Sequence, residues 1–499
     1  MKHINSNVIM KTFRYVTIMI LSVLLLASCK KSGYVNCIPS DATLVVSVDF
    51  NELATKADLR NSHLNEIVDQ YLGLVVFGEG LDKAKEYIDK PETIGIDFRE
   101  PAYFFRTAGG EFGATLCVHD ESALTEFINV LVKQDICTKP SEKNGYQTGT
   151  MLDDIQYGYD GSTLLLVASL EGGRSRQMLS SFMNQNDNNS FCSTDNFGKM
   201  VEMKDKDIIL YSNLGVLGND VKQMFSSVIP QGVHPADVEF FGSVAFENGV
   251  ARLTAEFEGA NDKTKEMLDD IDKNFYKITG EVAEDVLLDK TLIWGNIGVN
   301  GEWLLDKMKK SKELKQMLFV IERAVDVEAM IRSIDGDVSI AAPLSILEDQ
   351  EGVPDFSLKA HLKSTSFLND VKDWMEAQKD YGIVMINTAP DEYVFEYQHK
   401  PVIWAVNKKV LTMASYTYYT KDDTYYSEYL EQIPNYSVFF LINLQTLPLK
   451  EKAGLPDFLG FNEKIDKLKS FIIKASSAHE WEVDIELTDK EQNFLNALI

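Results

Sequence analysis

The sequence predicts an α+β protein made of two similar lobes, each an antiparallel sheet with helices packed on one face. Three observations predict this fold. Many short segments alternate apolar and polar residues, which is typical of strands with one buried face. Turns such as Asn248-Gly249 join neighbouring strands into hairpins. The same order of strands and helices occurs twice, which indicates an internal duplication.

The first predicted strand covers residues 43–50 and follows a turn at Pro39 and Asp41. Its apolar residues occupy alternate positions, so we expect one face of the strand to lie in a core. That predicted face consists of Leu44, Val46, Val48 and Phe50. A helix with an apolar stripe is expected next, and Ser62 is its predicted N-cap. The stripe is formed by Leu64, Ile67, Val68, Tyr71 and Leu72.

A strand followed by a capped helix is predicted at two places. Residues 112–118 alternate, and Asp120 can cap a helix that presents Leu124, Phe127, Ile128, Leu131 and Val132. Residues 356–362 alternate in the same way, and Ser364 to Ser366 supply caps. Leu368, Val371 and Met375 then fall where Leu124, Phe127 and Leu131 fell. The match fails at Lys372, which replaces Ile128.

Four further strands repeat in the same order. The predicted pairs are 163–169 with 409–415, 207–214 with 437–444, 251–258 with 481–486, and 43–50 with 291–297. They divide the folded part into a first lobe at 38–275 and a second lobe at 280–499, each of ordinary domain size. Because a strand followed by a helix is a generic motif, chance resemblance is the alternative to duplication.

The N-terminal segment indicates export. Basic residues precede an apolar run at 16–27 that is too short to span a bilayer comfortably. Leu26-Ala27-Ser28-Cys29 resembles a bacterial lipobox. The resemblance implies that residues 1–28 are a lipoprotein signal peptide, that Cys29 carries the lipid, and that residues 29–37 form the lipidated cysteine and its tether. An uncleaved N-terminal anchor helix is the alternative.

The residues after Cys29 bear on location. Lys30, Lys31 and Ser32 include neither the Asp of an inner-membrane retention signal nor an acidic surface-export stretch. By these lipoprotein rules, we expect the protein at the periplasmic face of the outer membrane. The partners expected are the membrane, through the lipid, and an envelope protein or a glycan.

Composition excludes one class of partner. The chain has 499 residues and a formal net charge of −27, so its field repels nucleic acid. Hydrophobic residues make up 45% of the chain, enough for packed cores.

Four cysteines remain after Cys29, all in the predicted first lobe. They are Cys37, Cys117, Cys137 and Cys192. An exported protein can form disulfides, and four cysteines allow three pairings. Two readings stay open: free thiols in a core, or a bridge confined to one lobe. Because no CxxC motif occurs, a redox or zinc site is not indicated.

No compact catalytic or metal motif is found in the sequence. The histidines form no HxxxH or HExxH pair, and there is no GxSxG elbow. Asp270, Asp272, Asn274 and Glu281 match four positions of a calcium loop, but Phe275 stands where the loop needs glycine. Met267, Ile271 and Phe275 instead form a helical stripe. We therefore predict no catalytic residue, no metal and no cofactor.

Two clusters are candidate binding surfaces. Tyrosines crowd residues 416–436, and exposed rings can stack on sugars, although strand aromatics are also ordinary core residues. The candidate glycan contacts are Tyr416, Tyr418, Tyr419, Tyr425 and Tyr426, with Tyr429 and Tyr436 nearby. Lysines at 307–315 indicate a solvated helix face or, alternatively, a docking patch.

The lipobox, the segment Ile38-Pro39-Ser40-Asp41-Ala42 with its strand, and a short helix through Leu53 and Lys56 resemble one family. It is the Bacteroidetes lipoproteins with domain of unknown function 4836. Ile433-Pro434, before the strand at 437–444, is a weaker echo. The resemblance implies an envelope lipoprotein and supplies no catalytic residue.

The sequence therefore favours a non-catalytic structural or protein-interaction module of the cell envelope. A glycan-binding lipoprotein is the alternative, and an enzyme with a dispersed site is a further one.

Overall fold

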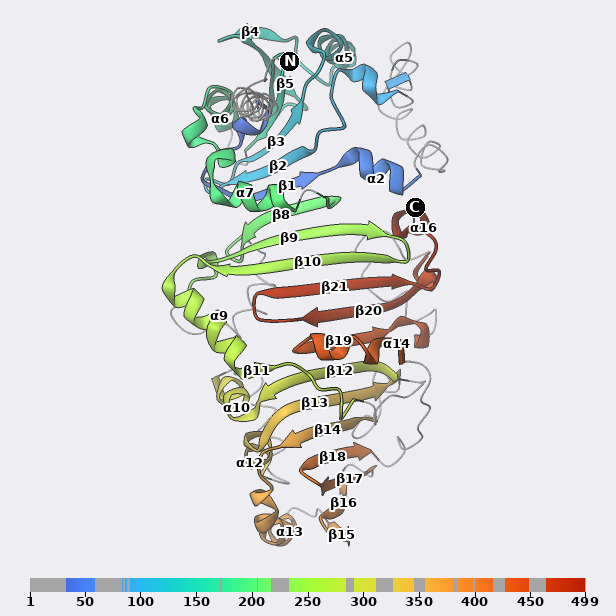
Figure 1. Ribbon diagram of the computed structural model, residues 1–499. Coiled ribbons are helices and arrows are strands. Elements are labelled where there is room, and N and C mark those ends of the chain that lie inside the picture. The colour runs from blue at the N-terminus through green and yellow to red at the C-terminus, as the bar shows by residue number, and fades with distance from the viewer. Residues whose placement is uncertain are drawn as a thin grey trace, which may run out of the picture. The chain divides into compact units, whose positions relative to one another are not determined.

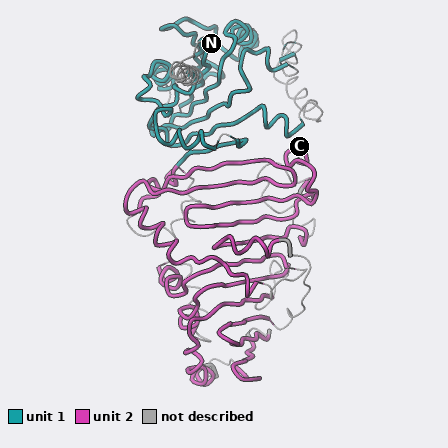
Figure 2. The backbone as a smooth tube through the Cα atoms, viewed as in Figure 1, with its two compact units in different colours: residues 1–212 teal, residues 213–499 magenta. Residues whose placement is uncertain are grey.

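The computed structural model shows an α+β protein (Figure 1), which confirms the predicted class. The structure describes residues 33–58, 83, 86–87, 90–169, 173–203, 205–216, 233–283, 291–310, 326–344, 355–379, 384–397, 400–415, 427–447 and 464–498. The chain divides into two compact units, unit 1 at 1–212 and unit 2 at 213–499 (Figure 2). All ladders between the described strands are antiparallel, as the alternating segments predicted.

Unit 1 contains an eight-stranded sheet. Its order is β8-β1-β2-β3-β7-β6-β5-β4. The elements are β1 (Ala42–Val48), α2 (Phe50–Lys56), β2 (Ala102–Thr107), β3 (Phe112–Cys117), α5 (Glu121–Lys133), β4 (Ser141–Lys143), β5 (Tyr146–Met151), β6 (Ile155–Tyr159), β7 (Thr163–Ala168), α6 (Arg174–Met183), α7 (Asp195–Glu202) and β8 (Ile208–Asn213).

Helix α5 forms where the sequence predicted it. The Asp120 side chain accepts hydrogen bonds from the backbone N–H groups of Ser122 and Ala123 and so caps the helix. Leu124 and Ile128 are buried. They pack with Tyr157 and Tyr159 of β6 in one core cluster. This helix therefore covers one face of the sheet beside β3, β6 and β7.

The predicted core face of the first strand is wrong. Val45 is fully buried and Ser47 nearly so, whereas Leu44, Val46 and Val48 are half-buried. Phe50 begins α2 and is 39% exposed. Both faces of this strand carry apolar side chains, so alternation locates the strand but does not identify its better-covered face.

Unit 2 contains a longer antiparallel sheet of order β9-β10-β21-β20-β19-β12-β13-β14-β18-β17-β16-β15. The elements are β9 (Val238–Glu247), β10 (Val250–Gly259), α9 (Asp262–Asn274), β11 (Phe275–Tyr276), β12 (Thr291–Asn300), α10 (Gly301–Lys310), α12 (Val327–Arg332), β13 (Ile334–Pro343), β14 (Ser357–Leu362), α13 (Val371–Lys379), β15 (Met385–Ala389), β16 (Glu392–Tyr397), β17 (Lys400–Asn407), β18 (Val410–Ser415), α14 (Ser427–Leu430), β19 (Val438–Asn443), β20 (Leu468–Ala475), β21 (Glu480–Leu487) and α16 (Phe494–Leu498).

The units divide the chain at 212, not at the 275–280 boundary expected from the sequence. The hairpin of β9 and β10 forms about Asn248-Gly249 as predicted, and Gly249 has a φ of +74°. Strand β10, however, also pairs with β21 from Val250–Glu486 to Glu256–Glu480. This long-range ladder joins the hairpin to unit 2.

The eight strands of unit 1 and the eight strands β12–β19 of unit 2 have the same order in their sheets. Unit 1 runs β8-β1-β2-β3-β7-β6-β5-β4, and unit 2 runs β19-β12-β13-β14-β18-β17-β16-β15. In both sets of eight strands, the pairing of the second strand with the third has a register shift near the start of the second strand. The shift lies at Ala42/Leu44 in β1 and at Thr291/Ile293 in β12.

Register refines one predicted strand match. Thr115 pairs with Leu165, and Lys359 pairs with Thr412 at the corresponding point. Thr163 therefore corresponds to Val410, one residue beyond the expected Lys409. A single-residue offset reverses which face a side chain occupies, so alignment by composition alone was not sufficient.

Helices cover one face of the unit 2 sheet near β12–β18. Residues of α10, α12 and α13 pack against a cluster that includes Val299, Leu362 and Trp404. A second cluster contains Trp294, Phe439 and Ile472, with Tyr429 and Ile433 packed on it. The predicted helix at 62–72 lies outside the described residues. None of the helices in the described ranges has the length and apolar character needed to cross a bilayer.

Candidate functional site

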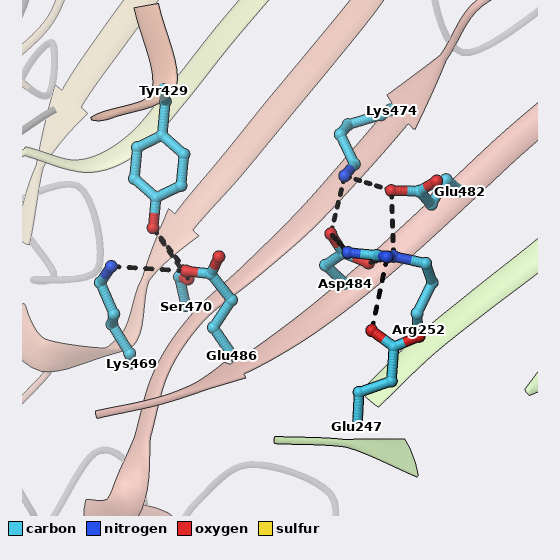
Figure 3. A network of polar contacts seen from close by, with 9 residues as sticks. All are labelled: Glu247, Arg252, Tyr429, Lys469, Ser470, Lys474, Glu482, Asp484 and Glu486. Atoms are coloured by element: carbon cyan, nitrogen blue, oxygen red, sulfur yellow. Dashed lines mark hydrogen bonds and ion pairs between the residues drawn. The ribbon is translucent and has the colours of Figure 1, made fainter. Parts of the chain in front are cut away.

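A network of charged side chains lies on one face of β10, β20 and β21 (Figure 3). In the sheet ladders, Arg252 is opposite Asp484, and Lys474 is opposite Glu482. Directly opposite residues share a face, so backbone register brings these groups together. The polar network consists of Glu247, Arg252, Tyr429, Lys469, Ser470, Lys474, Glu482, Asp484 and Glu486.

Lys474 is the most deeply placed cation of the polar network. The residue is 3% exposed, and its Nζ donates to Oδ2 of Asp484 at 2.7 Å. Its Nζ also forms an ion pair with Glu482. The Tyr436 ring centroid lies 5.5 Å from the same nitrogen, which adds a cation–π contact.

These carboxylates determine the protonation of Lys474. Burial alone would lower the pKa of Lys474, but the hydrogen bonds to Asp484 and Glu482 outweigh burial and raise it. A nucleophilic lysine or a lysine base needs the opposite shift, because it must lose its proton near neutral pH. This side chain is therefore suited to holding charge and unsuited to covalent catalysis.

Arg252 links three acidic residues. Its Nε and Nη2 donate to the two oxygens of Asp484 at 2.9 and 3.3 Å. Glu482 lies 3.4 Å from Nε, and Glu247 lies 3.5 Å from Nη1. The hydrogen bond to Asp484 is the main cause of a raised pKa for Arg252. Two cations thus face three carboxylates, and the local charge is nearly balanced.

Glu486 forms the second part of the polar network. Its Oε2 accepts hydrogen bonds from the Tyr429 hydroxyl at 2.5 Å and from the Ser470 hydroxyl at 2.6 Å. Lys469 Nζ lies 3.5 Å from the same oxygen and 5.2 Å from the Tyr429 ring centroid. Tyr429 belongs to α14, so this carboxylate attaches a helix to the sheet.

The sequence analysis did not identify this polar network. A signal was present, since Glu480, Glu482, Asp484 and Glu486 alternate along one strand and Lys474 interrupts an apolar one. Arg252 could not be added, because it reaches Asp484 only through a ladder between residues 232 positions apart. The arrangement can bind neighbouring strands together electrostatically, and its groups are already engaged with one another.

The tyrosine prediction falls mostly where the structure gives no description. Tyr416, Tyr418, Tyr419, Tyr425 and Tyr426 lie outside the described residues, as does Cys29. Tyr429 is 2% exposed, and Tyr436 is partly buried against the same core cluster. These last two rings are therefore packed within the protein and do not offer a face to a sugar.

The four described cysteines are thiols and form no disulfide. Of the two readings that the sequence left open, the thiols are the observed state. Burial raises the pKa of Cys37 to about 12 and that of Cys137 to about 11. A thiolate is the reactive form, so these two residues are poorly suited to nucleophilic or redox chemistry.

The calcium-like string is part of a helix. Asp270, Asp272 and Asn274 lie in α9, which Asn261 and Thr264 cap reciprocally. Oδ2 of Asp270 accepts hydrogen bonds from Trp303 Nε1 and Lys307 Nζ, both at 2.9 Å. Across the described part of the chain, no three His, Cys, Asp or Glu residues are grouped to hold a metal ion.

The predicted lysine face is partly engaged. Lys307 contacts Asp270, and Lys309 forms an ion pair with Glu328 of α12. Lys312 and Lys315 lie outside the described residues. Within α10, these contacts favour a structural role for the first two lysines.

Comparison with known proteins gives one extensive match. The family model described as Domain of unknown function (DUF4836) matches residues 34–495. No curated protein matches the chain. Crystal form IV of TP0453 is 14% identical with a TM-score of 0.27, covering 45% of this chain and 80% of that one. Crystal form III gives 14% identity and a TM-score of 0.28, covering 48% and 87%.

Proposed function

The chain belongs to the Domain of unknown function (DUF4836) family, and from that premise we propose a lipid-anchored envelope protein that acts as a structural or protein-interaction module without catalysis. The observation that carries the proposal is that the charged groups of the polar network already contact one another. Its three cations and four carboxylates are paired with one another, and Lys474 is held protonated. Charged groups that are already paired in this way are suited to holding strands of the sheet together and are not suited to acting on a substrate.

The anchor is supported by the N-terminal sequence. Cys29 follows Leu26-Ala27-Ser28, and only Lys30, Lys31 and Ser32 separate it from the first described residue. Lipidation of this cysteine would hold the folded protein close to a membrane, since several acyl chains give firm attachment. The expected site is the periplasmic face of the outer membrane in a bacterium of the Bacteroidetes.

We further propose that the chain arose by internal duplication. Equal strand order in the two sheets supports it, as do the matching register shifts in β1 and β12. The equivalent central pairs also agree: Val46 lies between Leu210 and Phe104, and Gly295 lies between Phe440 and Ile340. The β9–β10 and β20–β21 hairpins complete the two repeats, which meet where β10 pairs with β21.

Two measurements test the functional proposal. Cells fed a labelled fatty acid should label the protein, and Cys29→Ser should abolish the label. In-cell crosslinking of the C-terminally tagged protein, followed by mass spectrometry, should then yield a reproducible protein partner at comparable abundance. An unlabelled wild type would contradict the anchor. Recovery of abundant bystanders alone would contradict the interaction role.

A further inference from the structure

The sheet of unit 2 ends in a strand with a free edge among the described residues. Strand β15 pairs with β16 and with no other described strand. Val384 and Ile386, two residues apart, are 61% and 58% exposed. Backbone N–H and C=O groups along such an edge can accept a further strand.

The corresponding edge of unit 1 is protected. Strand β4 pairs with β5 and consists of Ser141, Glu142 and Lys143, all exposed. Charged side chains on a short edge strand are a common protection against unwanted pairing. Strand β15 has no charge, and the uncharged stretch extends over residues 381–390. This edge is therefore open to pairing where its counterpart is closed.

An apolar row on the sheet ends at this edge. Ile386 pairs with Val394, and Val394 pairs with Ile403. Ile403 pairs in turn with Ala414, which is 2% exposed. Side-chain exposure thus decreases inward from the edge, and a strand added beside β15 would continue the row and cover Ile386.

We propose that β15 pairs antiparallel with β15 of a second copy of this chain, about a two-fold axis. Such isologous pairing puts Val384 and Ile386 of both copies on one face, where each covers the other. Electrostatic repulsion also favours contact at β15. Each chain has a formal net charge of −27, so two copies repel each other least along a strand without charged residues. The inference rests on the proposed interaction function and identifies its surface and partner.

The test is sedimentation velocity of the full chain, purified from membranes in a density-matched detergent, over a range of concentrations. The wild type should form a dimer with a dissociation constant in the micromolar range, because a single strand pairing is a small interface. The double variant Val384→Lys/Ile386→Lys should raise that constant at least about tenfold, since charges would then face each other across the edge.

A control for added positive charge is Leu152→Lys, which puts one lysine in place of a side chain that is 65% exposed in a turn. It should dimerise as the wild type does, and circular dichroism should show that all variants fold. A monomeric wild type at every concentration, or an edge variant that dimerises unchanged, would overturn the proposal. Distinct in-cell partners found by crosslinking would still support the interaction function, so the two ideas fail separately.

Discussion

Unit 1 and strands β12–β19 of unit 2 share a sheet order but differ in the polar groups that they bury. Ser47 in β1 is hydrogen-bonded to Tyr103 in β2. The corresponding pair in β12 and β13 is Asn296 and Ser339, at 2% and 0% exposed. Within the described residues, neither side chain has a hydrogen-bond partner. Two regions with the same strand order therefore bury different polar side chains at corresponding positions.

The buried charges differ as well. Unit 1 buries a carboxylate, Glu111, at 1% exposed and 2.7 Å from Arg174. Unit 2 buries an ammonium group, that of Lys474, in addition to the carboxylates of Asp337 and Asp484. All five tryptophans lie after residue 213, and all five cysteines lie before it. Tryptophan fluorescence therefore reports on unit 2, and thiol reactivity reports on unit 1.

The largest effect is expected from Lys474→Met. Removing the cation leaves Asp484 and Glu482 without their buried partner, which costs about 3–5 kcal/mol. Urea unfolding followed by tryptophan fluorescence should show the loss, with thiol reactivity of unit 1 unchanged. Arg99→Met removes a cation that is 81% exposed in its ion pair with Asp97, so solvent screening should make its effect on stability far smaller than that of Lys474→Met. Equal losses in the two variants would contradict the importance of burial.

Substitutions at the corresponding polar pairs should act in opposite directions. Asn296→Leu removes buried groups that lack partners and should stabilise unit 2 by about 1–2 kcal/mol. Ser47→Ala leaves the Tyr103 hydroxyl buried without its partner and should destabilise unit 1 by about 1–2 kcal/mol. Urea midpoints from the two probes measure both changes, and shifts of the same sign would refute the comparison.

Removing the cap of α5 should have a smaller, local effect. Asp120→Ala loses two hydrogen bonds from backbone N–H groups and should destabilise unit 1 by about 1 kcal/mol. Cys137 packs in the same cluster as Leu124, so its thiol should react faster in the variant. Asp120→Asn keeps a capping oxygen and is the matched control. Reactivity equal to that of the wild type in the Ala variant would argue against the cap.

The smallest effects are expected from pH. Burial alone would raise the pKa of Glu111, but the hydrogen bond from Thr107 and the charge of Arg174 outweigh it and lower the pKa. The contribution of Glu111 to the stability of unit 1 is therefore present above the ordinary pKa of glutamate. It is lost as the pH falls through the pKa that Glu111 has in the folded protein.

Lys474 behaves in the opposite way. Because the pKa of Lys474 is raised, its contribution to the stability of unit 2 is present below the ordinary pKa of lysine. That contribution is lost as the pH rises through the pKa that Lys474 has in the folded protein. Exposure of the unit 1 thiols, measured with a dipyridyl disulfide that still reacts at acidic pH, should increase first on acidification. Tryptophan fluorescence should change first at alkaline pH. Glu111→Gln and Lys474→Met should each remove one of these responses, and persistence in either variant would count against the assignment.

The local sequence pattern predicted where strands form more reliably than it predicted which side chains they bury or contact. The segments at 112–118, 207–214 and 437–444 form β3, β8 and β19, and Asp120 caps α5 as expected. The better-covered face of β1 was not predictable, because Val45 and Leu44 are equally apolar and tertiary contacts decide between them. The polar network was missed for the same reason, since Arg252 and Asp484 meet only through tertiary pairing.

The ladder between β10 and β21 has a kinetic consequence. In the proposed export the chain crosses the membrane N-terminus first, so residues 250–256 arrive long before residues 480–486. The edge of β10 that pairs with β21 therefore stays unpaired until nearly all of unit 2 has followed. Unit 1 has no such delay, because its last strand, β8, pairs with β1 inside the first 213 residues. Contacts of high sequence separation form slowly and leave strand edges vulnerable to aggregation. A chain that ends before residue 480 should therefore engage holding chaperones of the envelope through the β9–β10 hairpin, while all strands of unit 1 can still pair.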